Sequence, residues 1–104
     1  MSEHFNGLAP DQAELLSLLA EECAEVIQVV AKIQRHGLHS HNPFDLERTT
    51  NLELLHQELG DVATAAQLLI DIELLEQAQL NDAAQAKLAR VGKYLHHHRT
   101  KEFP

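Results

Sequence analysis

The stretch EECAE at residues 21–25 decides how the whole sequence is interpreted. It lies in a long run without glycine or proline, in which apolar residues recur every three or four positions, as they do along one face of a helix. Successive residues of a helix are about 100° apart, and this spacing places Glu22 and Glu25 within the apolar face. The apolar members of that face are Leu15, Leu18, Val26, Val29 and Ile33. Two acids therefore lie where leucine-like residues are expected.

A second stretch, ELGD at residues 58–61, repeats this arrangement with Glu58 and Asp61. The apolar residues that share their face are Leu54, Leu55, Val62, Ala65, Leu68 and Leu69. If the two helices pack antiparallel through these faces, the four carboxylates converge between them. Carboxylates gathered there would repel one another and lose hydration, which is tolerable only when a cation is present.

Ligand sets made only of oxygen select hard cations, so the predicted metal is Mg²⁺ or Mn²⁺ rather than zinc. Glu21 lies beside the first pair and is a candidate to hold a second ion or to orient a water molecule. The opposing interpretation is that these acids are ordinary solvated helix charges. One acidic pair alone would favour that interpretation, whereas two pairs within apolar faces favour a metal site.

The composition predicts an all-α fold. Aromatic residues make up only 4% of the 104 residues, and the apolar residues are mainly leucine, alanine, valine and isoleucine at helical spacing. We expect a single domain over residues 1–104, with a core at about 10–95 and a polar tail at 96–104. Three main helices carry more apolar surface than they can bury among themselves. A four-helix or larger bundle completed by oligomerisation, as a homodimer or homotetramer, is therefore expected.

The first predicted helix begins at Pro10, which needs no hydrogen bond at that position, and ends near Arg35. Gly37 is placed to terminate it as the residue after the helix. Residues 37–50 contain glycine and proline without a clear period, so they predict a long loop that is functional or mobile.

The second predicted helix is capped by Thr50 or Asn51 and runs to about residue 75 or 77. Asn81 and Asp82 are suitable caps for a third helix over about 83–95. Basic residues line one side of that third helix, in contrast to the acidic character of the rest of the chain.

The formal net charge of −8 argues against nucleic acid or an anionic membrane as a partner, because both require a basic surface. It does not exclude an anionic substrate that arrives with a divalent metal. The single cysteine, Cys23, is predicted to be a small buried residue and fits a reducing compartment. With no signal peptide and no apolar run of about 20 residues, the expected location is the cytoplasm.

The two acidic motifs, EECAE and ELGD, resemble the signature of the all-α nucleoside triphosphate pyrophosphohydrolases, the MazG-like superfamily. Their surroundings, including EVIQ and KIQRHG after the first motif and NLELL before the second, resemble the short single-domain members, many of them phage or prophage proteins. The resemblance covers roughly residues 14–95. The long segment between the motifs departs from the pattern. So do Leu54 and Leu55, where some members carry a basic residue.

The resemblance implies Mg²⁺-dependent hydrolysis of a nucleoside or deoxynucleoside triphosphate to the monophosphate and pyrophosphate. It implies that the metal ligands are Glu22, Glu25, Glu58 and Asp61. Glu21 and Glu22 are the candidates for catalytic residues. The candidates for substrate binding are Lys87, which matches a third-helix lysine of the family, and, by position, Lys32, Arg90 and Lys93.

Two other functions stay open at this point. The chain could be a non-catalytic interaction or regulatory module on the same fold, or a phosphohydrolase of another diphosphate-containing metabolite. The loop histidines His36, His39 and His41 are either solvated or in contact with a nucleotide, and the sequence does not decide between these.

Overall fold

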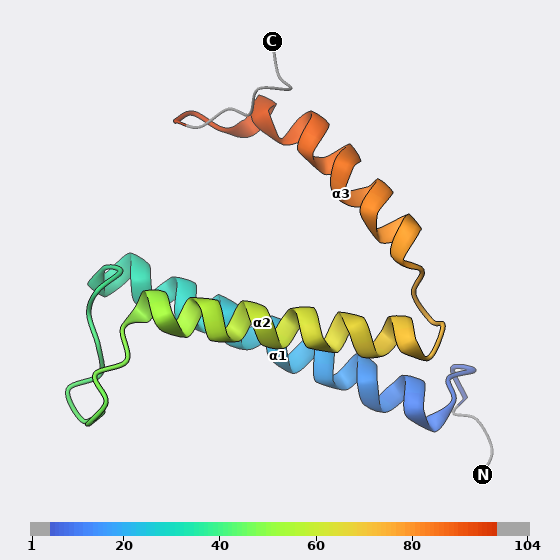
Figure 1. Cartoon of the computed structure of the whole chain (residues 1–104), viewed down its shortest axis with the longest axis horizontal. Helices are drawn as coiled ribbons and strands as arrows, with labels where there is room; N and C mark the ends of the chain where they lie inside the picture. The colour runs from blue at the N-terminus through green and yellow to red at the C-terminus, as the bar shows by residue number, and fades with distance from the viewer. Residues whose placement is uncertain (1–4, 98–104) are drawn as a thin grey trace.

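A computed structural model of the chain describes residues 5–97. All of the regular elements in this range are helical, which confirms the predicted all-α fold class. In chain order they are α1 (Pro10–His36), α2 (Asn51–Asp71), α3 (Gln77–Val91) and a short 3₁₀ helix, η1 (Gly92–Tyr94). The helices α1 and α2 form a long antiparallel hairpin, and α3 leaves it at an angle (Figure 1).

The boundaries of α1 follow the predicted signals. Pro10 occupies the first helical position. At the other end, the N–H of Gly37 donates to the carbonyl oxygen of Ile33 at 2.7 Å, and the φ of Gly37 is 92°. This left-handed value is accessible to glycine without steric cost, so a glycine at this position ends the helix.

The start of α2 is as predicted, but its end is not. The Thr50 hydroxyl accepts a hydrogen bond from the N–H of Glu53, so Thr50 is the cap. The helix ends at Asp71, before the predicted residue 75 or 77. Glu73 adopts a φ of 64°, and the N–H groups of the next two residues both donate to the carbonyl oxygen of Leu69. The chain therefore turns back at a non-glycine residue, which is a signal that sequence inspection does not reveal.

The helix α3 begins at Gln77, well before the predicted start at residue 83. Asn81 and Asp82, which were predicted as caps, lie inside it. The side chain of Asn81 accepts a hydrogen bond from Gln77 one turn earlier at 2.9 Å, so it bonds along the helix surface instead of capping a helix end. The α-helix ends at Val91 and continues as η1, so the predicted end at residue 95 is also too late.

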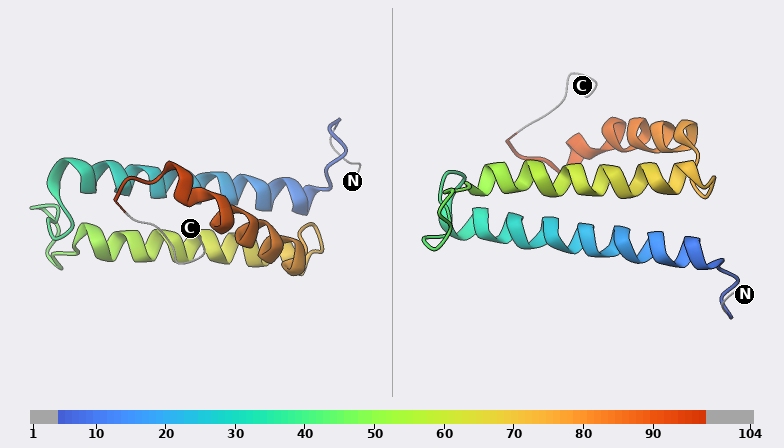
Figure 2. Two further views of the ribbon diagram at one scale, coloured as in Figure 1. Left: turned by 90° about the horizontal axis from the view of Figure 1, so that it is seen from above. Right: turned by 60° about the horizontal axis from the view of Figure 1, so that its bottom comes forward.

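The core of the described chain is small and lies between α1 and α2. The buried apolar side chains are Val29, Ala65 and Leu69, and α3 contributes none. Because α3 makes almost no contact with the hairpin, the radius of gyration of 17.6 Å exceeds the ~13 Å expected for a compact domain of this length. Two views related by rotation show the same long hairpin with α3 on one side of it (Figure 2). Most of the apolar surface of α3 is therefore uncovered in the single chain.

Two further predictions concern exposure. Cys23, predicted to be buried, is exposed on α1, because it lies off the face that packs against α2. None of the helices in the described part of the chain combines the length and the hydropathy that a transmembrane span requires.

The substitution Leu69→Ala is expected to lower the free energy of unfolding by about 3 kcal/mol, because it removes a fully buried side chain from the α1–α2 interface. Urea denaturation followed by circular dichroism measures this. Leu46→Ala, at a side chain that is 98% exposed, is the matched control and should change stability by less than about 0.5 kcal/mol. Equal effects of the two substitutions would contradict the proposed core.

Candidate metal centre

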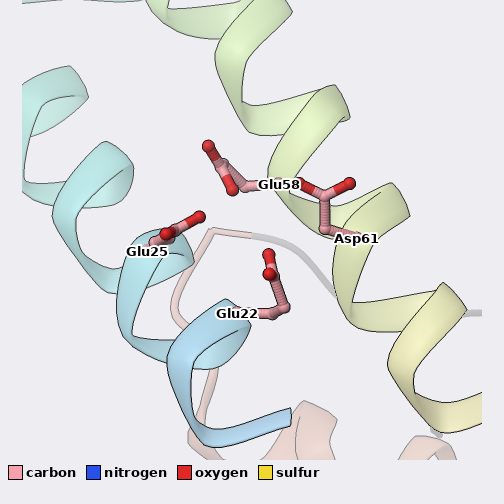
Figure 3. Close-up of side chains that lie close together, drawn as sticks. All are labelled: Glu22, Glu25, Glu58 and Asp61. Atoms are coloured by element: carbon pink, nitrogen blue, oxygen red, sulfur yellow. The ribbon is translucent and has the colours of Figure 1, made fainter. Parts of the chain in front are cut away.

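Four carboxylates converge at the middle of the α1–α2 hairpin. Glu22 and Glu25 project from adjacent turns of α1, and Glu58 and Asp61 project from adjacent turns of α2. Figure 3 shows the four side chains pointing toward one another across the space between the helices. One carboxylate oxygen from each residue lies within 4.8 Å of the other three. The helical faces predicted from the sequence therefore meet as expected.

The two glutamates nearer the interface carry buried oxygens that lack partners. Glu22 and Glu58 are half-buried, whereas Glu25 and Asp61 are exposed. Oε2 of Glu22 and Oε2 of Glu58 are both screened from solvent, and neither has a hydrogen-bond donor. A buried acceptor without a donor is unfavourable, and a buried charge without a counter-charge is more so. These oxygens therefore favour the presence of either a proton or a cation.

The pKa of Glu58 reflects the same unfavourable gathering of carboxylates. It is raised from 4.5 to about 7, first by a hydrogen bond that its protonated carboxyl group shares with Glu25. Desolvation follows, and then the negative charges of Glu25, Asp61 and Glu22. Such a hydrogen bond between two acids exists only when one of them is protonated, so it breaks when both ionise.

The pKa of Glu22 is also raised above its ordinary value, mainly because burial removes its carboxylate from water. The charges of Glu25, Asp61 and Glu21 act in the same direction, followed by a hydrogen bond with Asp61. The environment of these two glutamates thus opposes their negative charge, and a bound cation would reverse this balance.

The four residues fit a hard divalent cation. The donors are all carboxylate oxygens, which Mg²⁺ and Mn²⁺ prefer. Ligands on opposite sides of a Mg²⁺ ion are about 4.2 Å apart, so the 4.8 Å spread of the four oxygens needs only a small closure to reach a common ion. The unpartnered Oε2 atoms of Glu22 and Glu58 provide acceptors that are already buried and free.

The other predicted site residues fall into two groups. Glu21 is exposed beside the cluster, and its charge acts on Glu22. Lys32 lies two turns beyond Glu25 on α1 and lines a cavity at the end of the hairpin. The basic residues of the third predicted helix are exposed on α3 and η1, away from the hairpin (Figure 1). They are Lys87, Arg90 and Lys93. Within one chain, the structure does not bring these three residues to the carboxylates.

Sequence reasoning missed one residue near the site. Arg35 lines the same cavity as Lys32. The signal was available, because Lys32 and Arg35 are three residues apart and therefore share a face of α1. In the sequence, Arg35 served only to mark the end of the first predicted helix.

Comparison with known proteins identifies the family. The family model of the MazG nucleotide pyrophosphohydrolase domain matches residues 11–98. The chain belongs to this MazG family. No curated protein and no solved structure gives a significant match. The family match spans α1, α2 and α3, so both halves of the carboxylate cluster lie inside the MazG domain.

The stability of the metal-free MazG domain is expected to depend on pH through Glu58. The folded protein holds a proton on Glu58 up to a pKa of about 7, whereas the ordinary value is 4.5. Between these values the folded state binds more protons than the unfolded state, so this contribution to stability is lost as the pH rises from about 4.5 through 7. Thermal unfolding of the wild type and of Glu58→Gln in a chelator, over this range, measures the effect.

The wild type should be less stable than Glu58→Gln above pH 7 and should approach it near pH 5. Mg²⁺ should raise the melting temperature of the wild type above pH 7 and have little effect near pH 5, where protons compete for the same oxygens. Glu14→Gln, at an exposed acid of α1, is the control and should follow the wild type. Parallel curves for all three proteins would contradict the assignment.

Proposed function

We propose that this MazG domain hydrolyses nucleoside or deoxynucleoside triphosphates to the monophosphate and pyrophosphate, with Mg²⁺ as cofactor and Mn²⁺ as a substitute. The observation that carries the proposal is the cluster of four carboxylates with two buried, unpartnered oxygens. Membership of a nucleotide pyrophosphohydrolase family supports the reaction class. A triphosphate would be repelled by these acids alone, so substrate and metal are expected to bind together.

In this proposal the four carboxylates hold the metal. Two adjacent glutamates, Glu21 and Glu22, take up the proton that the attacking water loses. When bound, Mg²⁺ supplies positive charge for the phosphate oxygens and lowers the pKa of water. Glu22 is half-buried and carries an oxygen without a hydrogen-bond donor, which makes it the candidate to accept that proton. Glu21 is exposed next to it and is placed to position a water molecule or to pass the proton to solvent.

The basic residues proposed for substrate binding come from two places. Lys32 lies seven residues after Glu25, on the same face of α1. Lys87, Arg90 and Lys93 lie on the separate α3–η1 segment, so we propose that they reach a carboxylate cluster only when chains associate. The charge of an enzyme-bound triphosphate exceeds what one divalent ion neutralises, and these cations would supply the remainder.

We further propose that the domain is a homodimer or homotetramer. The helix α3 has no buried residue, and exposed apolar side chains also occur on the hairpin, with Ile27 70% and Leu59 50% exposed. A second chain would cover such surface and complete a bundle of four or more helices. The cytoplasm, where nucleoside triphosphates are found, is the compartment that this activity implies.

The purified protein is expected to release pyrophosphate from at least one nucleotide in a panel of canonical and modified nucleoside and deoxynucleoside triphosphates with Mg²⁺. Glu58→Gln should lower kcat/KM by at least about 100-fold, because it removes a proposed metal ligand that also carries one of the buried, unpartnered oxygens. Pyrophosphate and monophosphate are quantified separately by chromatography. Activity that persists in a chelator would exclude the metal-dependent reaction.

Glu14→Gln removes one negative charge from an exposed position on the same helix as Glu22 and should retain wild-type activity. Release of orthophosphate instead of pyrophosphate would favour a phosphohydrolase of a different metabolite. If no nucleotide is turned over, and Mg²⁺ stabilises neither the wild type nor Glu58→Gln, the chain is a non-catalytic module on the same fold.

Light scattering coupled to size-exclusion chromatography is expected to give a molar mass at least twice the 11.7 kDa of one chain at micromolar concentration. The physical reason is the uncovered apolar surface of α3 and the hairpin. Leu88→Glu, which places a charge on the half-buried side of α3, should shift the species toward the monomer. A wild-type protein that is monomeric at these concentrations would contradict the proposed association.

A further inference from the structure

A cavity of about 500 Å³ lies at the end of the hairpin where the last turns of α1 meet the segment 37–50. In Figure 1 this is the teal and green end of the molecule, opposite the connection between α2 and α3. Its volume is within the range of about 300–1,000 Å³ that is typical of small-molecule sites. The metal-centre residues do not line it, so it is a separate feature of the hairpin.

The wall of the cavity is enriched in positive and hydrogen-bonding side chains. Lys32 and Arg35 both line it, although the whole sequence has only 8 lysine and arginine residues and a net charge of −8. His36 and His41 line it as well and add ring nitrogens. Such a concentration of cationic groups in an acidic protein favours an anionic ligand.

One acid, Asp45, is among the lining residues, and its carboxylate is already engaged by the loop. One of its oxygens accepts the N–H of Glu47 at 3.1 Å, and the other accepts the N–H of Thr49 at 2.9 Å. These backbone donors hold the pKa of Asp45 below its ordinary value. Asp45 therefore shapes the loop, and its hydrogen-bonding capacity is directed toward the loop backbone.

The cavity is preformed because hydrogen bonds hold the loop against the start of α2. Asn51 is buried, its N–H donates to the carbonyl oxygen of Ser40 at 2.9 Å, and its side-chain Nδ2 donates to the carbonyl oxygen of Gly37 at 3.1 Å. An isolated β-bridge pairs His41 with Thr50. A ligand would consequently find the wall in place and would not have to order the loop, which favours affinity.

The cavity lies close to the metal centre along both helices. Lys32 is seven residues after Glu25, which places it on the same face of α1 at a distance of about 10 Å along the axis. Leu54, which lines the cavity on the other helix, is four residues before Glu58, or about 6 Å along the axis of α2. The long, flexible side chain of Lys32 spans part of the distance between the cavity and the carboxylate cluster. One extended phosphorylated ligand can therefore contact both the carboxylate cluster and the cavity.

We propose that this cavity binds the pyrophosphate end of the nucleoside triphosphate, with Lys32 and Arg35 on its β- and γ-phosphates, while the α-phosphate lies at the carboxylate cluster. This rests on the proposed function and extends it to the orientation of the substrate. Arginine provides two parallel N–H donors that match phosphate oxygens, and lysine adds a point charge. The alternative occupant is the nucleoside, but leucine and proline supply the only apolar side chains of the wall, and histidine supplies its only aromatic rings.

This orientation gives the two cations a role in the reaction. Water oxygen becomes bonded to the α-phosphorus, and the bond from that phosphorus to the bridging oxygen breaks. The bridging oxygen keeps the electron pair and leaves as part of pyrophosphate, while the proton lost by the water passes to a carboxylate and then to solvent. Lys32 and Arg35 lie where the leaving pyrophosphate gains negative charge, so they would lower the barrier as well as bind the substrate.

The test measures the binding of inorganic pyrophosphate to the full chain with saturating Mg²⁺, by isothermal titration calorimetry. Arg35→Gln and Lys32→Gln should each weaken binding about tenfold, because each removes a charge from the cavity wall. Arg48→Gln is the matched control: Arg48 is an exposed cation of the same loop that does not line the cavity, so its loss should change the affinity by less than about twofold. In proton NMR of the wild type, pyrophosphate should shift the ring signals of His36 and His41.

The three substituted side chains are exposed, so the stabilisation by Mg²⁺ should match that of the wild type and confirm that each variant folds. Equal pyrophosphate affinity in all four proteins would overturn the proposal, because the metal centre alone would then account for binding. An uncharged nucleoside that shifts the signals of His36 and His41 would also overturn it, by placing the opposite end of the substrate in the cavity.

Failure of the proposed function and failure of the proposed substrate orientation give different experimental results. If no triphosphate is hydrolysed, the same titration is made with the intact triphosphate. Dependence of its binding on Arg35 and Lys32 would uphold the orientation while the catalytic proposal falls. Conversely, an active enzyme whose kcat, KM and pyrophosphate affinity do not change in Arg35→Gln would retain the proposed function and overturn this inference alone.

Discussion

The close approach of four carboxylates across the antiparallel pair α1 and α2 is the main electrostatic constraint on this structure. Hydrophobic packing on either side of the cluster, through residues such as Val29 and Leu69, holds the helices together and so forces the acids into one place. The pKa values of Glu22 and Glu58 are raised as a result, and each residue has one buried oxygen without a hydrogen-bond donor. The apolar contacts thus stabilise an arrangement that is electrostatically unfavourable until a cation or a proton enters it, which is a common physical basis of a metal site.

Positive and negative charge are separated along the same hairpin. The acids occupy its middle, and Lys32 with Arg35 occupies the end that the loop closes. A triphosphate with a divalent ion has complementary parts, because the ion suits the carboxylates and the uncovered phosphate charge suits the cations. The continuous helix α1 carries Lys32 and Arg35 as well as two of the acids, so it sets the distance between the two regions. This fixed spacing provides a physical means of orienting a substrate.

The third helix, α3, shows how little apolar surface a single chain of this length can bury. With 104 residues and α3 standing apart, only three apolar side chains are buried among the described residues. A helix of this kind gains most of its stability from tertiary packing, because isolated helices of about 15 residues are marginal in water. Contact of the apolar side around Leu88 and Val91 with another chain, as in the proposed association, would supply this packing.

The sequence by itself determined the all-α class, α1 from Pro10 to the glycine after it, the Thr50 cap of α2 and the four carboxylates. Each depends on local spacing or on the stereochemistry of one residue, and the antiparallel hairpin then brings Glu22 and Glu25 to Glu58 and Asp61. Tertiary structure alone decided the turn at Glu73, the early start of α3, the exposure of Cys23 and the cavity beside Arg35. The physical reason is that these features depend on which surfaces meet and on where a loop folds back through long-range hydrogen bonds such as that of Asn51 with Gly37. Periodicity along the chain carries no information about such contacts.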